Sequence, residues 1–257
     1  MAPHADDLSV ALRLADAADA ITTARFRADD LVVDRKPDRS PVTDADTAVE
    51  DAIRAVLADS LPRDEILGEE RGGSIGPGRT WVVDPIDGTK NFLRGVPAWA
   101  TLIALVDGGS PVVGVVSAPA FGRRWWASAG EGAFGSFGGV TRPLRVSGVR
   151  SLEDAYLSTT DLQAWGAARS RYLELVEACW ESRAFGDYWQ HCLVAEGGLD
   201  VVAEPIANPW DLAAVQILVT EAGGTFTDLT GEPRFDGGSA LATNGHLHEA
   251  ALSILRG

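Results

Sequence analysis

The sequence predicts a layered protein of helices and sheets, α+β in its first half and α/β in its second. In the first half, amphipathic helical segments precede apolar strands that are joined by short turns, which is typical of helices packed on an antiparallel sheet. In the second half, short apolar strands alternate with helical segments, which indicates an α/β layer. We expect two halves, residues 1–148 and 149–257, packed so tightly that they can count as one domain.

The first half begins with a predicted helix at 6–28, where apolar side chains recur at helical spacing. An extended segment at 31–33 and a Pro-rich mobile loop at 36–41 follow it. Thr43 or Asp44 can cap a second amphipathic helix. Further strands are predicted at 65–67, 81–83, 99–106, 112–118, 124–128 and 144–147, with a Gly-rich reversal between the last two.

The second half alternates regularly between the two kinds of element. Strands are predicted at 155–159, 182–185, 201–204, 225–228 and 240–243, and helices at 169–181, 189–196, 209–222 and the C-terminus.

Composition excludes several classes of function. The net charge of −15 argues against a nucleic-acid partner, which requires a basic face. No apolar run approaches the roughly 20 residues of a membrane span, so no membrane partner is expected. Residues 1–7 lack an apolar signal core, and Cys179 and Cys192 stand apart in apolar helical contexts. We therefore predict a cytoplasmic protein with reduced cysteines.

Two carboxylates follow the apolar run at 81–83. Asp84 and Asp87 stand three residues apart, and Pro85 between them disfavours a continued strand. Gly88 and Thr89 come next, where the chain can enter a helix and offer free backbone N–H groups to an anion. Carboxylates suit a hard divalent cation, and a bound cation would reverse the acidic field of the protein. This stretch therefore indicates chemistry on a phosphate, although acidic residues are also common in ordinary turns.

Two further carboxylates extend the pattern. Glu69 comes directly after a predicted strand, where a sheet presents side chains to a ligand, although a solvated acidic loop is an alternative. Asp211 lies in the first turn of a helix that Asn208 caps and Pro209 begins, where it could simply stabilise the helix dipole. None of the four histidines is spaced with these carboxylates, so the set favours Mg²⁺ or Mn²⁺ over zinc.

These motifs resemble those of the inositol monophosphatase family in order and spacing, over essentially the whole chain. The resemblance rests on Glu69, on the run Asp84–Thr89, and on Trp210–Asp211 followed by Glu221–Gly224. Supporting matches lie at 43–46, 96–100, 124–126, 184–187 and 193–197. Within that family the chain looks most like the actinobacterial histidinol-phosphate phosphatases.

The resemblance implies a layered αβαβα sandwich of the inositol monophosphatase/fructose-1,6-bisphosphatase type. It implies two to three Mg²⁺ ions in each site, for which Mn²⁺ can substitute. Glu69, Asp84 and the carbonyl of Ile86 would hold the first ion. Asp84, Asp87 and Asp211 would hold the second, and Glu69 could reach a third.

The resemblance also implies catalytic roles. Two cations would clamp the attacking and leaving oxygens of an in-line displacement. Thr89 and Asp44 occupy the positions that orient the attacking water, and Glu69 completes the catalytic set. Asp87 and the backbone N–H groups of Gly88 and Thr89 would bind the phosphate.

Two other classes of function remain as alternatives. The run Asp84–Thr89 superficially resembles the nucleophile loop of haloacid-dehalogenase-type phosphatases, but the carboxylates of that loop stand two residues apart instead of three. A catalytically silent metal-binding protein is the other alternative, and the complete set of metal-site residues argues against it.

Substrate choice must come from residues over the leaving group. By the resemblance, Glu204 matches a position that meets the polar groups of the substrate, and Gly186 and Asp187 lie in the corresponding substrate-facing loop. Asp187 and Glu204 are acidic and would suit a cationic amine or imidazolium, so we expect hydrolysis of L-histidinol phosphate to L-histidinol. Arg183 and Asn244 are further candidates, although either could be a plain surface or turn residue. The alternative is an inositol-1-monophosphatase or a broad phosphatase for small sugar or polyol phosphates, and the family also implies a homodimer and lithium sensitivity.

Overall fold

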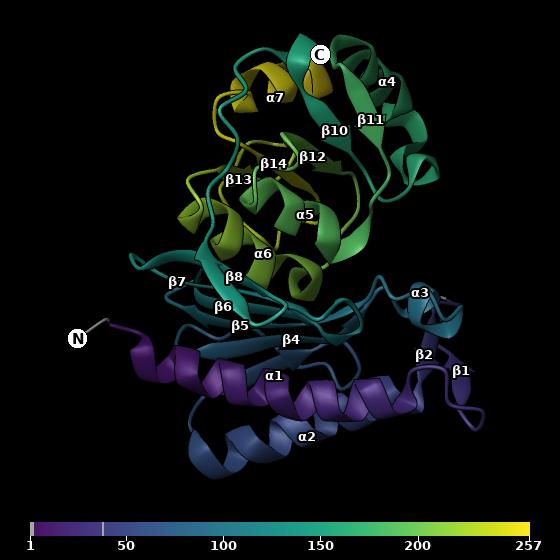
Figure 1. The fold of residues 1–257 in the computed structure, drawn as a ribbon, viewed down its shortest axis with the longest axis vertical. Helices are drawn as coiled ribbons and strands as arrows, with labels where there is room; N and C mark the ends of the chain where they lie inside the picture. The colour runs from purple at the N-terminus through teal and green to yellow at the C-terminus, as the bar shows by residue number, and fades with distance from the viewer. Residues whose placement is uncertain (1–2, 38) are drawn as a thin grey trace.

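The computed structural model shows five layers of alternating helices and sheets (Figure 1). It describes residues 3–37 and 39–257. Met1 and Ala2, and Asp38 in the predicted loop at 36–41, lie outside the described residues. Helices α1 (Ala5–Arg25) and α2 (Asp44–Ser60) form the first layer. They cover one face of a seven-stranded sheet, and α5 (Asp187–Ala195) and α6 (Pro209–Glu221) cover the other face. A five-stranded sheet follows, and α4 (Arg169–Ala178) with α7 (His248–Arg256) closes the stack. The predicted layered sandwich is confirmed.

The seven-stranded sheet is an antiparallel meander with one parallel pair at its edge. Its strands, in spatial order, are β3 (Glu65–Gly68), β4 (Thr80–Asp87), β5 (Ala100–Asp107), β6 (Ser110–Ala118), β7 (Arg123–Ser128), β8 (Gly132–Phe137) and β9 (Val140–Pro143). Gly68 of β3 is paired with Val83 of the parallel strand β4. Because parallel strands end at the same edge, Glu69 is brought beside Asp84.

Two predictions for this sheet are wrong. Strand β4 does not end at Asp84 but continues to Asp87, with an irregular register that accommodates Pro85. The Gly-rich stretch is mostly strand β8, and residues 144–147 are not a strand. A Cβ at Gly135 would lie 3.3 Å from the Trp125 ring, so this glycine makes room for a neighbour. The turn itself uses Gly138 and Gly139, both with positive φ.

The five-stranded sheet is mixed. Its spatial order is β11 (Glu181–Arg183), β10 (Tyr156–Ser158), β12 (Val201–Glu204), β14 (Ala240–Thr243) and β13 (Thr225–Thr227). The remaining elements are the hairpin β1 (Val33–Arg35) and β2 (Pro41–Thr43), helix α3 (Thr89–Leu93), and the 3₁₀ turns η1 (Pro119–Phe121), η2 (Leu152–Asp154) and η3 (Leu162–Ala168). Helix α5 begins two residues before its predicted start, at Asp187.

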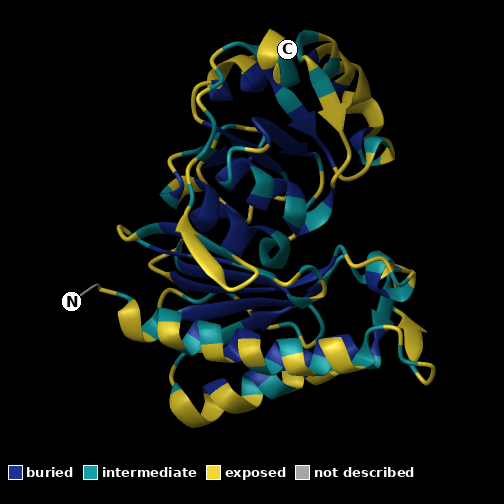
Figure 2. Ribbon diagram, viewed as in Figure 1, coloured by how far each residue is buried: buried dark blue, intermediate teal, exposed yellow. Residues whose placement is uncertain are grey.

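Buried apolar residues form a core between every pair of layers. Figure 2 shows the strands of both sheets largely in the dark blue of buried residues. The middle core joins Leu102 of β5, Leu218 of α6 and Ala242 of β14, so both sheets share it. The chain passes from the seven-stranded sheet to the five-stranded sheet between Pro143 and Tyr156, close to the boundary predicted at 148/149. The division into two domains itself stays a prediction. Within the described residues, no helix combines the length and apolarity that crossing a membrane requires.

The contact between α6 and β6 yields a stability prediction. A Cβ at Gly114 would lie 2.6 Å from Ile217 and 2.7 Å from the Ala214 carbonyl oxygen, so the helix approaches the strand closely. Gly114→Ala should lower the free energy of unfolding by about 1–3 kcal/mol, because the added methyl forces the two layers apart. Urea denaturation measures this, with Gly148→Ala as the control, since no atom lies within 4 Å of a Cβ there. Equal stabilities of the two variants would contradict the packing.

Candidate active site

Three carboxylates, of which Asp84 is buried and Asp87 and Asp211 are half-buried, converge where β4 meets the N-terminus of α6. One ligand oxygen from each of Asp84, Asp87 and Asp211 lies within 4.8 Å of the other two. Backbone N–H groups hold each of them: Ile86 N donates to Asp84 Oδ1 at 3.0 Å, and Tyr188 N donates to Asp87 Oδ2 at 2.5 Å. Asn208 N donates to Asp211 Oδ2 at 2.8 Å in a capping box. The carboxylates are therefore fixed by the fold and point toward one another.

The electrostatics of this group fit a divalent cation. Burial raises the pKa values of Asp84 and Asp87 well above the ordinary range, and the neighbouring carboxylates raise them further. Burial likewise raises the pKa of Asp211 to about 6. No ion pair within the described part of the chain involves any of the three. Buried charges of one sign are costly without a counter-charge, and an all-oxygen donor set suits a hard cation such as Mg²⁺.

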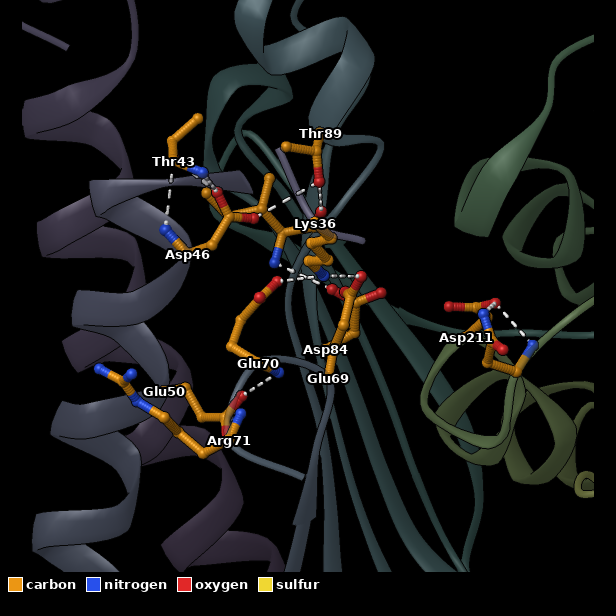
Figure 3. A network of polar contacts seen from close by, with 12 residues as sticks. Lys36, Thr43, Asp46, Glu50, Glu69, Glu70, Arg71, Asp84, Thr89 and Asp211 are labelled. Carbon is orange, nitrogen blue, oxygen red and sulfur yellow. Dashed lines mark hydrogen bonds and ion pairs between the residues drawn. The ribbon is translucent and has the colours of Figure 1, made fainter. Parts of the chain in front are cut away.

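Glu69 lies at the rim of this group and forms an ion pair with Lys36. Lys36 Nζ lies 2.6 Å from Glu69 Oε1 and 2.7 Å from Glu70 Oε1. Figure 3 shows Glu69 and Lys36 beside Asp84, with Asp211 approaching from a separate element. The charge of Glu69 also raises the pKa of Asp84, so the two carboxylates act on each other electrostatically.

The turn that carries Glu69 is held by a buried glutamate. Glu50 of α2 accepts hydrogen bonds from Glu70 N at 2.7 Å and Arg71 N at 3.0 Å (Figure 3). A side chain at Gly68 would collide with the Glu50 carboxylate. Glycine at this position therefore allows α2 to anchor the turn.

The predicted pairing of Thr89 with Asp44 is wrong. Asp44 is the first residue of α2 and turns outward to an ion pair with Arg25, 2.7 Å away. Asp46, at the third position, turns back to the cap residue Thr43 and lies 3.4 Å from Thr89 Oγ1. Thr89 Oγ1 also donates to the Ile86 carbonyl at 2.9 Å. The spacing of a capping box, with an acid three residues after Thr43, is the sequence signal that distinguishes Asp46.

A pocket adjoins the carboxylates on the side of α3. It has a volume of about 450 Å³, and its lining includes Glu69, Gly88, Thr89 and Asp187. Gly88 has a φ of +85°, and a Cβ there would lie 2.9 Å from the Ala98 carbonyl oxygen. Within the described residues, the backbone N–H groups of Gly88 and Thr89 make no hydrogen bond. They are thus available to an anionic ligand.

A second, smaller pocket continues from the first toward the five-stranded sheet. Its volume is about 150 Å³, and it shares Thr160, Asp161 and Asp187 with the larger pocket. Asp187 has a φ of +48°, a strained conformation for a non-glycine residue, and accepts a hydrogen bond from Asn91 Nδ2 at 3.2 Å. Burial raises the pKa of Asp187.

Glu204 lies on the inner wall of the smaller pocket. It is only 6% exposed and accepts hydrogen bonds from Thr160 N at 2.6 Å, from the Thr160 hydroxyl, and from the Gln190 amide. Burial raises its pKa to about 7, and the hydrogen bonds of Thr160 oppose that shift.

Two predicted substrate residues are not brought to these pockets. Arg183 is an exposed residue paired with Glu181, and it lines neither pocket. Asn244 is 2% exposed, and its amide donates to Ser147 Oγ and to the Val149 carbonyl. This buried amide ties the end of β14 to the segment at 147–149 and is not available to a ligand in either pocket. Gly186, by contrast, lines the larger pocket with a φ of +75°.

Thr160, Asp161 and His191 line the smaller pocket and were not among the site residues predicted from the sequence. No local pattern marks them, because they reach the pocket only through the pairing of β10 with β12 and the packing of α5.

Comparisons with known proteins agree with this geometry. Residues 5–256 match the model of the inositol monophosphatase family. The histidinol-phosphatase of Mycobacterium tuberculosis is 55% identical over 97% of this chain and 98% of its own. The histidinol-phosphatase of Streptomyces coelicolor is 51% identical over 99% and 98%. An inositol monophosphatase structure from Zymomonas mobilis covers all of both chains, with 35% identity and a TM-score of 0.88.

The carboxylate group predicts a metal-dependent stability. Mg²⁺ should raise the melting temperature of the wild type, because a ligand that binds only the native state stabilises it. Asp84→Asn should melt higher than the wild type without Mg²⁺, since it removes a buried charge, and should lose the Mg²⁺ response. Differential scanning calorimetry measures both effects, with exposed Asp59→Asn as the control that keeps the response. An undiminished Mg²⁺ shift in Asp84→Asn would contradict the assignment.

Glu204 predicts a pH-dependent stability. Its folded pKa of about 7 exceeds the ordinary 4.5, so the protonated carboxyl stabilises the fold below pH 4.5 and this contribution is lost as the pH rises through 7. Glu204→Gln keeps an acceptor oxygen but cannot ionise. In metal-free urea denaturation, its stability relative to the wild type should increase from pH 5 to pH 8, by at most about 3 kcal/mol. A stability difference that does not change with pH would show that Glu204 does not titrate in this way.

Proposed function

The chain belongs to the inositol monophosphatase family, and we propose that this phosphoric monoester hydrolase converts L-histidinol phosphate to L-histidinol and phosphate. The observation that carries the choice of substrate is the acidic lining beyond the phosphate site. Asp161, Asp187 and Glu204 line the smaller pocket, and neither arginine nor lysine does. A cationic leaving group would find counter-charges there, whereas a neutral polyol would not need three carboxylates.

We propose Mg²⁺ as the cofactor, held by Asp84, Asp87 and Asp211, with Glu69 and the Ile86 carbonyl as further ligands. When bound, such ions lower the pKa of water and offset charge on the leaving oxygen. The convergence of three carboxylates that form no ion pair with a basic side chain of the described residues supports the proposal. The family resemblance indicates two to three ions, and Mn²⁺ suits the same oxygen donors.

Thr89 and Asp46 are proposed to orient the attacking water. The hydroxyl of Thr89 lies 2.9 Å from the Ile86 carbonyl oxygen and 3.4 Å from Asp46 Oδ1, so its one proton can be donated to either oxygen while its lone pairs accept from a water. Burial raises the pKa of Asp46 to about 6, which suits a group that accepts a proton near neutral pH.

The phosphate is proposed to bind at the start of α3. The free N–H groups of Gly88 and Thr89 face the larger pocket and can donate to phosphate oxygens. These donors are fixed before the substrate arrives, so they stabilise developing charge without reorganisation. The leaving group would then extend past Asp187 toward Glu204.

A substrate comparison tests the proposal. The ratio kcat/KM should be clearly higher for L-histidinol phosphate than for inositol 1-phosphate. Asp187→Asn should raise KM for histidinol phosphate and leave KM unchanged for glycerol 2-phosphate, whose leaving group is neutral. Only the substrate with a cationic leaving group loses a counter-charge. A preference for inositol phosphate would overturn the proposal in favour of an inositol-1-monophosphatase.

The corrected pairing of Thr89 gives a kinetic prediction. Asp46→Asn should lower kcat on the order of 100-fold or more, because the asparagine keeps the cap but cannot accept a proton. Asp44→Asn should leave kcat unchanged, since Asp44 is bound to Arg25. Steady-state kinetics at saturating Mg²⁺ measures both. A larger loss in Asp44→Asn would restore the pairing predicted from the sequence.

The cytoplasmic location and the homodimer stay predictions. Both cysteines are free thiols, which is typical of a reducing compartment.

A further inference from the structure

The protein buries two histidines in very different surroundings. His248 is 4% exposed, and both of its ring nitrogens have partners: Thr227 Oγ1 lies 3.0 Å from Nε2, and Thr243 Oγ1 lies 3.1 Å from Nδ1. His191 is 3% exposed, and its ring forms no hydrogen bond to any described residue. Buried polar groups are almost always paired, so His191 requires an explanation.

The position of His191 supplies one. It lies on α5 four residues after Asp187, one helical turn further along the same face. Both side chains line the smaller pocket, together with Glu204 of β12 and Asp161 of the loop before η3. His191 is therefore part of the pocket wall, where a ligand can lie against its imidazole.

The pocket is suited to a small ring. Its volume of about 150 Å³ is on the order of ten times the ~10–15 Å³ that one water needs. Apolar Ile206, Ala207 and Leu212 contribute to its wall and can contact the faces of a ring, while the carboxylates and His191 can contact its polar atoms. Phe226 does not line the pocket but packs near the His191 ring, 6.2 Å away, centroid to centroid.

We propose that His191 is a specificity-determining residue that accepts an N–H hydrogen bond from the imidazole ring of the leaving group. The inference rests on the proposed function and deepens it. Asp161, Asp187 and Glu204 would balance the positive charge of the leaving group, and His191 would identify its ring.

The protonation state of His191 agrees with this role. Burial lowers its pKa to about 4, so the ring is neutral at physiological pH. A neutral imidazole has one bare nitrogen that accepts a hydrogen bond, and it does not repel a cation. Without a ligand, the unpaired ring is expected to cost stability instead of supplying it.

Three variants of the full-length protein test the inference in the presence of Mg²⁺. His191→Leu removes the hydrogen bond at similar volume, and His191→Asn retains an acceptor. His248→Leu is the matched control, because it removes a buried imidazole that is already paired. KM and kcat are measured for L-histidinol phosphate and for 2-aminoethyl phosphate, which carries an amine but no ring, and melting temperatures are recorded in parallel.

His191→Leu should raise KM for histidinol phosphate about tenfold, with kcat and the KM for aminoethyl phosphate unchanged. Its melting temperature should be unchanged or higher, and His191→Asn should restore part of the affinity. His248→Leu should lower the melting temperature and leave the ratio of the two KM values unchanged.

Three results would overturn the inference. An unchanged KM in His191→Leu excludes contact with the ring, and equal KM increases for both substrates exclude ring recognition. A lower melting temperature with equal losses on both substrates shows a purely structural role.

If the wild type itself does not prefer histidinol phosphate, the proposed function fails and the inference fails with it. A wild type with that preference and an unaffected His191→Leu variant would overturn the inference alone.

Discussion

The mutual repulsion of Asp84, Asp87 and Asp211 is the constraint on which the rest of the site depends. Three carboxylates buried this closely are unfavourable in an isolated chain, which their raised pKa values express. The fold opposes the repulsion with backbone N–H donors from Ile86, Tyr188 and Asn208, and these donors fix one oxygen of each carboxylate. The remaining oxygens are left for a counter-charge. The repulsion among the three carboxylates lowers the stability of the metal-free fold, and it leaves a cation site that is already formed.

The layered architecture makes this arrangement rigid. The donor to Asp87 is the backbone of Tyr188, at the start of α5, so the two halves of the chain meet at the site itself. The parallel pairing of β3 with β4 places Glu69 at the same edge, and the shared middle core fixes the two sheets relative to each other. In the proposed site, the phosphate-binding groups come from the first half, and the leaving-group contacts come from the second half, which also supplies Asp211.

Local sequence patterns predicted the parts of the site that short motifs encode. The spacing of Asp84 and Asp87 and the cap at Asn208 depend on neighbouring residues alone. The phosphate loop of Gly88 and Thr89 was predicted in the same way. The alternation of strands and helices is also local, and it predicted a layered fold. The five-layer order and the joint roles of Glu69 and Asp211 came from the family resemblance.

The errors have physical causes that are not local. Asp44 and Asp46 differ only in which side of a helix start they face, and the capping box decides that. Gly135 of β8 resembles a turn residue until Trp125 is placed against it. Asn244 and His191 are both buried polar residues, and only the three-dimensional structure shows that one has all its partners while the other has none.

The most direct test of the cation site is an anomalous difference map from crystals soaked in Mn²⁺. The account predicts strong peaks among Asp84, Asp87, Asp211 and Glu69, two of them roughly 3.5–4 Å apart. A map without peaks there, at saturating Mn²⁺, would contradict it.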